Sequence, residues 1–543
     1  MTLNQWIYFG ACAVYIGFFL LFVRFFYWKY YSTKHCWSKR PWLSDEPGPD
    51  APFLSIVIPA REEADVIART IRHLAALDYP KERYEVIIAS DDKEQRDADR
   101  IRRDAVAECE TALITGDMRA TGLGVFARQM LTCLLRQEAA CHGVHAYGRK
   151  QGTALLNGLG YGETRRVINY CLIDSSLRDR LWSLARMLYP TTQEVVEETI
   201  SAPGYDRPRV VHVSVPCDFD GFYPGQCVGQ DVRSTKGRAL NRALSALSPH
   251  TEMIGFFDAE SRPDPGVLRY VAYRLRSASP PSILQGPVFQ VRNYFSINPL
   301  CRIAALYQAV SHDWYLPYLF RALPFVGGTN LFISRDLLIS SGGFDRDILT
   351  EDLEYGVRAY LVWGAWPEYL PYPSSEQTPP TIMAFFRQRM RWGTGHLQVM
   401  KKVSGMTDVD PLKRRVLLRR LFLKGQAEWI MYQTATLVPP AMIVLWHLGM
   451  VDPSAAPAIL RYFLHVITLT YFGFTFYVFR RYSDYIDKNT APKTALACCM
   501  AYLGLLLLPL AAFLFPFPYT AALIRYSMTA RPMSWTKTPR TRE

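Results

Sequence analysis

Two carboxylates close a hydrophobic run in the middle of the chain. The run at 253–257 stops on Asp258, and Glu260 follows at position i+2. At the end of a strand, such a pair offers hard oxygen ligands for Mg²⁺ or Mn²⁺ bound to a diphosphate. Acidic residues also commonly terminate strands, so the pattern taken alone permits either a metal site or a strand end.

A second acidic pair, Glu351 and Asp352, follows Thr350 and precedes an expected helix that continues to about Trp363. Thr350 could cap this helix, and acids in the first turn suit the helix dipole. Asp352 could instead act as a general base that takes a proton from an attacking hydroxyl. The two interpretations are compatible with each other.

A basic, aromatic segment at 384–399, AFFRQRMRWGTGHLQV, contains the third group: Gln388, Arg391 and Trp392. On a helix, these residues would offer cations for a diphosphate leaving group and an indole for the face of a sugar. The segment is also typical of a basic amphipathic helix that lies on anionic lipid. Both interpretations stay open on the residues alone.

The region 53–400 alternates short apolar strands with amphipathic helices, which predicts an α/β domain. We expect strands at 54–58, 86–89, 210–215 and 253–257, and helices at 63–77 and 235–247. Asp91 and Asp92 follow the second of these strands, as Asp258 follows the fourth. Parallel sheets bind ligands at the carboxyl ends of their strands, so these carboxylates should meet.

Both ends of the chain contain apolar segments that are typical of membrane spans. A charge-free run at 7–23 is followed by five basic residues and preceded by none, which favours a retained anchor with the next domain in the cytoplasm. Two further spans are expected at 429–451 and 462–479. The run at 494–524 is too long for one straight span and is broken by three prolines, so a re-entrant hairpin fits it best.

The distribution of the basic residues and of the cysteines limits the classes of function that the chain could have. Lys and Arg exceed Asp and Glu by 13 among 543 residues, but the surplus gathers at 400–403, 413–424 and the C-terminal tail, beside the predicted spans. Interfacial amphipathic helices on lipid explain this placement, and nucleic-acid binding is disfavoured because no recognition motif accompanies the charge. The eleven cysteines are dispersed without CxxC, which indicates reduced thiols.

The order of these motifs resembles the processive family 2 glycosyltransferases, the enzymes of the cellulose, chitin and hyaluronan synthase type. A strand-end Asp, a DxD-like pair, TED and QxxRW follow one another between membrane anchors. The connecting segments agree with this resemblance: SIVIPAREE (55–63), KGRALNRAL (236–244), QGPVFQVRN (285–293), GGTNLF (327–332), GGFD (342–345), QRMRWGTGHLQ (388–398) and the tail SWTKTPR (534–540).

The resemblance implies a GT-A-like α/β domain with a mixed, mainly parallel sheet, which carries out an inverting transfer from a UDP-sugar to a β-linked product. Asp352 would be the general base, and Glu351 would shape its site. Asp258 and Glu260 would bind Mg²⁺ or Mn²⁺. The residues implied to bind the nucleotide, its phosphates or the acceptor sugar are Glu63, Asp91 (with Asp92 as the alternative), Lys236, Gln388, Arg391 and Trp392.

The chain departs from the family pattern at three places. DAE replaces the commoner DxD at 258–260, and SDDK at 90–93 replaces the usual DDG. Residues 93–209 also form an insertion where the family has a much shorter connection. Its helical pieces, such as 177–189, favour a folded insertion, with a regulatory or partner-binding role as the hypothesis.

These observations predict a multi-pass integral membrane polysaccharide synthase that helps to translocate its product, with a UDP-sugar donor, a glycan acceptor and membrane lipid as its partners. Transfer of a single sugar to a lipid or short acceptor is the alternative within the enzyme class. A catalytically inactive homologue that serves as an export platform is the alternative outside it. The expected parts are an anchor (1–28), a cytoplasmic catalytic domain (53–400), interfacial helices (401–426), a transmembrane region (427–527) and a basic cytoplasmic tail (528–543).

Overall fold

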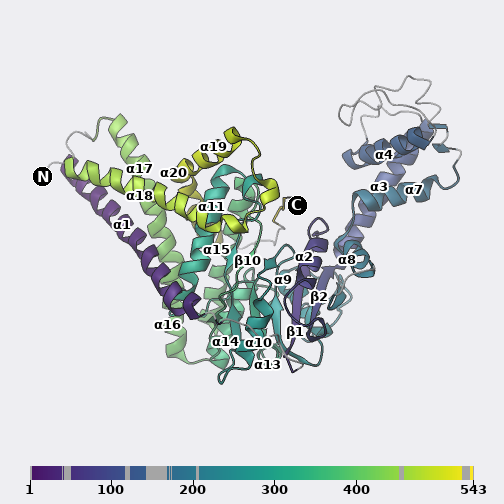
Figure 1. Ribbon diagram of the computed structural model, residues 1–543, viewed down its shortest axis with the longest axis horizontal. Coiled ribbons are helices and arrows are strands. Elements are labelled where there is room, and N and C mark those ends of the chain that lie inside the picture. Colours follow the sequence, from purple (N-terminus) through teal and green to yellow (C-terminus); the bar gives the residue numbers. More distant parts are fainter. Residues whose placement is uncertain are drawn as a thin grey trace.

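The computed structural model of the protein describes residues 3–39, 41, 50–115, 123–141, 168–169, 171–172, 174–202, 207–451, 458–528 and 538–541. A mixed sheet forms the centre of the predicted α/β domain (Figure 1). Its seven strands run in the order β3-β2-β1-β4-β8-β6-β9. They are β1 (Phe53–Ala60), β2 (Tyr84–Asp91), β3 (Arg209–Val215), β4 (Thr251–Phe256), β6 (Ile283–Gln285), β8 (Leu331–Ser334) and β9 (Glu368–Tyr369).

The sheet is mainly parallel, as predicted. β1 pairs in parallel with both β2 and β4, and β2 pairs in parallel with β3. Strand β8 is antiparallel to both β4 and β6, while β6 and β9 are parallel. A smaller sheet has the order β5 (Arg262–Pro263), β10 (Ser374–Ser375), β7 (Val288–Phe289). Because β1, β2 and β4 run in the same direction, the residues that follow them gather at one edge.

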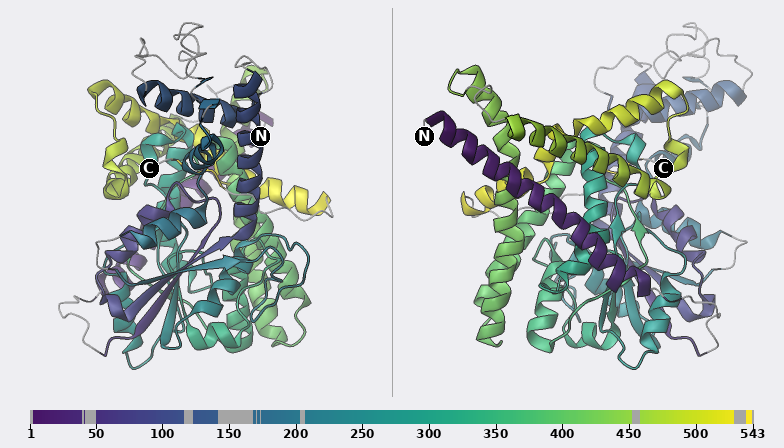
Figure 2. Two further views of the ribbon diagram at one scale, coloured as in Figure 1. Left: turned by 90° about the vertical axis from the view of Figure 1, so that its right-hand side faces the viewer. Right: turned by 60° about the vertical axis from the view of Figure 1, so that its left-hand side comes forward.

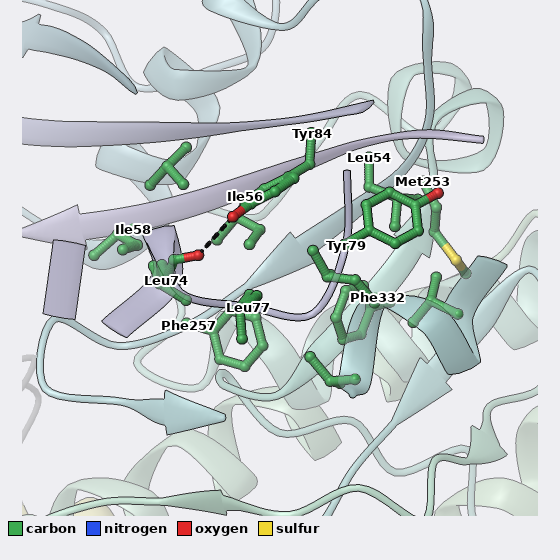
Figure 3. Packing of buried hydrophobic residues seen from close by; sticks show 14 of the residues in the cluster. Leu54, Ile56, Ile58, Leu74, Leu77, Tyr79, Tyr84, Met253, Phe257 and Phe332 are labelled. Carbon is green, nitrogen blue, oxygen red and sulfur yellow. Dashed lines mark hydrogen bonds between the residues drawn. The ribbon is translucent and has the colours of Figure 1, made fainter. Parts of the chain in front are cut away.

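Successive side chains of a strand point to opposite faces of the sheet, and each face carries a hydrophobic core. Leu54, Ile56 and Ile58 of β1 pack on α2 (Ile67–Ala75) and α10 (Val267–Leu275), as Figure 3 shows for part of this cluster. Val57 instead joins the other face, with α9 (Lys236–Ala243), α13 (Arg335–Ser340) and α14 (Glu351–Trp363). The Tyr84 hydroxyl donates to the Leu74 carbonyl oxygen at 2.8 Å, which satisfies a buried polar group within the first core.

The insertion is helical over its described part. It contains α3 (Asp92–Thr115), α4 (Val125–Cys141), α7 (Leu177–Leu188) and α8 (Thr192–Ser201). In Figure 1, α3 leads from the sheet to α4 and α7, which stand away from the main body. Residues of α3, α4 and α7 share a separate hydrophobic cluster. The helix predicted at 177–189 is therefore present, and it belongs to a small folded lobe.

Long helices occupy both ends of the chain. α1 (Leu3–His35), α17 (Glu428–His447) and α18 (Ala458–Tyr482) overlap the ranges where we predict spans and extend from the main body in the right view of Figure 2. Within the described ranges, one stretch, Ala495–Met528, is long and apolar enough to cross a membrane by length and composition. It is divided into α19 (Ala495–Leu503), α20 (Leu508–Ala511) and α21 (Phe517–Met528).

Two boundaries differ from the predicted ones. The helix predicted at 63–77 is α2, which begins at Ile67 rather than at Glu63, because residues 61–66 form a bend and turn beside the cavity described below. The helix that carries QxxRW, α15 (Ile382–Gly405), runs unbroken across the domain boundary predicted at 400. α16 (Pro411–Leu421) follows it and ends in a π-helix, Phe422–Ala427. These two segments are helical and cover most of residues 401–426, where we expect interfacial helices.

Candidate active site

One cavity of about 470 Å³ collects nearly all the predicted site residues, a volume that suits a small-molecule site. The members that line it come from the ends of β1, β2 and β4, from the starts of α9 and α14, and from the interior of α15. They are Glu63, Asp91, Lys236, Asp258, Glu260, Glu351, Asp352, Gln388, Arg391 and Trp392. Residues spread over more than 300 positions of sequence thus share one chamber.

Asp92 is the predicted residue that does not line this cavity. β2 ends at Asp91 and α3 begins at Asp92, so the two side chains diverge. Asp91 accepts from the Arg238 guanidinium at 3.2 Å, whereas Asp92 accepts from the Ser214 hydroxyl on β3. Of the two alternatives left open by the SDDK sequence, the geometry therefore favours Asp91.

The DAE pair lies beside a third carboxylate. One oxygen from each of Asp258, Glu260 and Glu376 lies within 4.8 Å of the other two. Glu376 Oε1 accepts from the Ser261 and Thr329 hydroxyls, each at 2.6 Å. The Oε2 atoms of Glu260 and Glu376 are buried and have no hydrogen-bond partner among the described residues. Three hard oxygen donors with unused capacity fit Mg²⁺ or Mn²⁺.

Burial and crowding raise the pKa of two of these carboxylates. Burial, together with the charges of Asp258 and Glu260, raises the pKa of Glu376 to about 7. Burial is also the main cause of a raised pKa at Glu260. Both groups would release protons more readily if a cation compensated their charge, which is the electrostatic setting of a metal site.

Lys236 links the metal-site carboxylates to the TED segment. Its Nζ donates to Asp258 Oδ1 at 2.5 Å and lies 4.0 Å from Glu351 Oε1. Burial alone would lower the pKa of Lys236, but Asp258 and Glu351 hold it above its usual value. A Cβ atom at Gly328 would lie 2.8 Å from Lys236 Nζ and 2.9 Å from Asp352 Oδ2, so the glycine leaves room for both side chains.

The TED segment only partly forms the predicted helix cap. Thr350 occupies the N-cap position of α14, but its hydroxyl makes no capping hydrogen bond. Burial, followed by the charge of Asp352, raises the pKa of Glu351 to about 7. Burial also raises the pKa of Asp352, against the opposing effect of Lys236. A buried carboxylate with a raised pKa is better suited to accepting a proton than an exposed one.

The QxxRW residues reach the cavity from one turn of α15. Gln388 and Arg391 line it, and the Oε1 atom of Gln388 is buried without a hydrogen-bond partner among the described residues. Trp392 also lines it, and the Arg389 guanidinium lies 3.9 Å from the centroid of its ring. This arrangement fixes the indole at the cavity wall.

Two residues at this site were not among those predicted. Glu376 lies in the loop after β10, where no local pattern marks it. Arg540, within the tail segment SWTKTPR, lines the cavity, and its Nη1 lies 2.7 Å from Glu260 Oε1. We expected the basic tail at a membrane interface, but its described part reaches the carboxylates instead. The tail motif SWTKTPR is the available signal for Arg540.

A second cavity, of about 660 Å³, adjoins the first. Its lining comes from α1, α11 (Pro299–Val310), α17, α18 and the segment 508–519, and is rich in aromatic residues. Residues that line both cavities lie where they meet: Gln308, Ser311, Tyr315, Lys424, Trp429 and Tyr519. Trp429 and Tyr519 stack there with ring centroids 3.9 Å apart. The cavity that contains the carboxylates and the cavity among the helices therefore share a wall.

Comparison with known proteins places the chain among sugar-transferring enzymes. The model of the family described as "Glycosyl transferase family group 2" matches residues 253–526. The probable glycosyltransferase YdaM of Bacillus subtilis (strain 168) is 26% identical over 196 residues, which are 34% of this chain and 44% of that protein. The match therefore spans less than half of that relative's length.

Solved structures show more distant likeness. The mannosyltransferase PcManGT from Pyrobaculum calidifontis, in complex with GDP-Man and Mn²⁺, is 13% identical, with a TM-score of 0.41 over 97% of this chain and 100% of that one. TarS 1–349 from S. aureus, in complex with UDP-GlcNAc, is 11% identical, with a TM-score of 0.32 over 74% of this chain and 84% of that one.

Proposed function

The chain belongs to glycosyl transferase family group 2, and we propose that it is an inverting membrane enzyme that transfers sugar from a UDP-sugar to a growing β-linked polysaccharide. One observation carries this proposal: the candidate metal ligands, the candidate base and the QxxRW residues line a single cavity. The mainly parallel sheet, with these residues at one edge, is the GT-A-like arrangement expected of the family.

The residues divide the chemistry among them. Asp258, Glu260 and Glu376 would hold Mg²⁺ or Mn²⁺, which when bound supplies positive charge to the donor diphosphate. Arg391, which lines the same cavity, adds a second cation. Asp352 accepts the proton of the acceptor hydroxyl as that hydroxyl attacks, and its raised pKa suits this task.

The remaining predicted residues hold the substrates. Asp91 and Glu63 line the side of the cavity formed by β1 and β2, and we assign them to the nucleotide. Lys236, already paired with Asp258, lies where it can also reach a phosphate. Trp392 offers a flat ring for the acceptor sugar, since aromatic side chains suit the apolar faces of sugars.

The second cavity supports a membrane route for the product. Many apolar side chains of α1, α17 and α18 are exposed, among them Phe9, Leu20, Val444 and Leu469. Exposed apolar side chains gathered on a few helices are typical of a lipid or protein interface. We propose that these helices lie in the membrane, with the catalytic domain in the cytoplasm, and that the product leaves through the second cavity.

Transfer of a single sugar to a lipid is the second candidate, because the lining of the second cavity also suits a hydrocarbon chain. The size of the product separates the two candidates. A processive enzyme yields long chains from its first turnovers, whereas single transfer yields one labelled lipid with a 1:1 ratio of sugar to acceptor.

The test is nucleotide release by the purified, detergent-solubilised chain against a panel of UDP-sugars, with GDP-mannose as the comparison donor. We expect release from one UDP-sugar with Mn²⁺ or Mg²⁺ and its loss with EDTA. If the chain used only GDP-mannose, the donor would be a GDP-sugar and not the UDP-sugar that we propose. Failure to bind any nucleotide or metal would instead support an inactive homologue.

A further inference from the structure

Two segments of the insertion, the start of α3 and the start of α8, meet the same short loop of the candidate active site. α3 begins at Asp92, directly after Asp91, and α8 begins at Thr192. The loop 61–63, which follows β1, lies beside both helix starts, and its residues Arg61 and Glu63 line the cavity. The insertion is thus attached to the wall that we assign to the nucleotide.

Glu94, in the first turn of α3, holds this loop from one side. Its Oε2 accepts from the backbone N–H of Glu62 at 2.5 Å. Its Oε1 accepts from the backbone N–H of Thr192 at 2.7 Å and from the Thr192 hydroxyl at 2.8 Å. The carboxylate is buried and lies at the N-terminus of α8, where the helix dipole favours negative charge.

Thr192 holds the loop from the other side. Its hydroxyl oxygen accepts from the backbone N–H of Glu63 at 2.8 Å while the hydroxyl donates to Glu94. The side chain is fully buried. Two consecutive backbone N–H groups of the loop are therefore bound by two side chains of the insertion.

The loop needs such support because of its backbone conformation. Glu62 has φ of +57°, in the left-handed region that residues with a Cβ atom rarely adopt. Strained conformations of this kind persist where the surroundings over-determine them, and they cluster at functional sites. Glu63, the next residue, lines the cavity.

The two supporting helices are also fastened to each other. Arg102 on α3 is completely buried and pairs with Glu194 of α8 at 2.9 and 2.5 Å. It also donates to the Tyr189 carbonyl oxygen at 2.7 Å. Buried, bidentate pairs of this kind restrict relative motion, so α3 and the start of α8 form one rigid support.

We propose that Glu94 and Thr192 are positioning residues for donor binding, through which the insertion sets the conformation of the Glu62–Glu63 loop. The proposal rests on the proposed function, because Glu63 is assigned there to the nucleotide. It makes the base of the insertion part of the donor site. It also predicts that removal of residues 95–205 weakens donor binding, even though none of the described residues in that range lines the cavity.

Thr192 offers a matched pair of variants. Thr192→Val keeps the shape of the side chain and removes the acceptor for the Glu63 N–H, whereas Thr192→Ser keeps the hydroxyl. We expect Thr192→Val to weaken binding of UDP with Mn²⁺ about tenfold, since a buried N–H loses its partner. KM for the donor should rise by a similar factor with kcat nearly unchanged, and Thr192→Ser should restore both. Unchanged affinity in Thr192→Val would overturn the proposal.

A matched control lies further along α3. Glu108 Oε2 accepts from the backbone N–H of Gly124 at 2.8 Å, a contact of the same kind that lies wholly within the insertion. Glu108→Ala should leave UDP binding unchanged, while Glu94→Ala should weaken it. Equal effects of the two substitutions would mean that the insertion acts through general stability, which contradicts a positioning role.

A second measurement needs no ligand. Amide hydrogen exchange in a peptide that covers residues 60–66 should become faster in Thr192→Val and Glu94→Ala, and should stay unchanged in Glu108→Ala. If the parent protein binds neither UDP nor GDP, the proposed function fails, and exchange alone then decides the positioning role. Unchanged exchange in both variants overturns the positioning role even where nucleotide binds normally.

Discussion

The Arg540 guanidinium lies 2.7 Å from the Glu260 carboxylate, although 280 residues separate them in the sequence. The neighbouring Thr541 fixes the approach: its N–H donates to Gln377 Oε1 at 2.9 Å, and the Gln377 amide donates back to the Thr541 carbonyl oxygen at 3.0 Å. A segment of the tail therefore places a cation against the carboxylates that we assign to the metal.

Competition between Arg540 and the metal follows from this contact. Arg540→Gln should tighten Mn²⁺ binding several-fold in the absence of nucleotide, because it removes a buried positive charge from the cluster. Titration of Mn²⁺ monitored by electron paramagnetic resonance measures this affinity. Lys401→Gln, at an exposed position of α15, is the control for net charge. Weaker Mn²⁺ binding in Arg540→Gln would show that the arginine supports the metal site instead.

Glu376 provides the third carboxylate of the cluster. Glu376→Gln should weaken Mn²⁺ binding by about tenfold or more, because the amide keeps the shape of the side chain but loses its charge. The two hydroxyls that bind Oε1 can still do so, which protects the fold. Glu82→Gln changes an exposed carboxylate and serves as the control. Equal metal affinity in all three proteins would exclude Glu376 as a ligand.

Asp352 is assigned the role of general base. Asp352→Asn should lower the rate of transfer by about 10²–10⁴-fold while UDP binding stays nearly intact, because the amide cannot accept the proton. UDP release and UDP affinity are measured on the same preparation. Asp336→Asn, at an exposed position of α13, is the control. Retained turnover in Asp352→Asn would remove the assignment.

Trp392 is assigned to the acceptor. Trp392→Ala should reduce chain elongation more than donor hydrolysis, because hydrolysis needs no acceptor sugar at the ring. The two rates are separated by comparing labelled product with total UDP release. Trp363→Ala removes a partly exposed indole at the end of α14 and should change neither rate. A loss shared equally by both rates would speak against acceptor binding.

Much of the sheet and of the site follows from local patterns. The strands at 54–58, 86–89, 210–215 and 253–257 are present because each is a short apolar run between turn signals, and their carboxylates meet because parallel strands end at one edge. The positions of these strands and their parallel direction are therefore enough to predict that Asp258 and Asp91 lie at the same edge of the sheet.

Other parts of the site depend on contacts that no local pattern encodes. Glu376 sits in a loop after a two-residue strand, and its place beside Glu260 is set by the pairing of β10 with β5 and β7. Arg540 reaches the cluster through the Thr541–Gln377 contact, which joins the tail to that loop. The choice between Asp91 and Asp92 depends on where β2 stops, and a strand end is rarely predictable to one residue.

Gly395 lies where α15 packs directly against Thr350 of the TED segment. A Cβ atom there would lie 2.5 Å from both Cγ2 and Oγ1 of Thr350, a contact that real side chains do not make. Gly395→Ala must therefore push α15 away from the start of α14, and so separate Arg391 from Asp352. We expect kcat to fall about tenfold or more, since displacements near 1 Å are enough for such losses.

Gly405, near the end of the same helix, is the matched control, because a Cβ atom added there would have no heavy atom within 4 Å. Gly405→Ala should leave kcat unchanged and slightly raise thermal stability, because alanine is the better helix former. Measurement of kcat and of the unfolding temperature for both variants separates a change of helix position from a change of helix propensity. If Gly395→Ala kept full activity, the close packing of α15 on Thr350 would not be what positions Arg391 in the cavity that also contains Asp352.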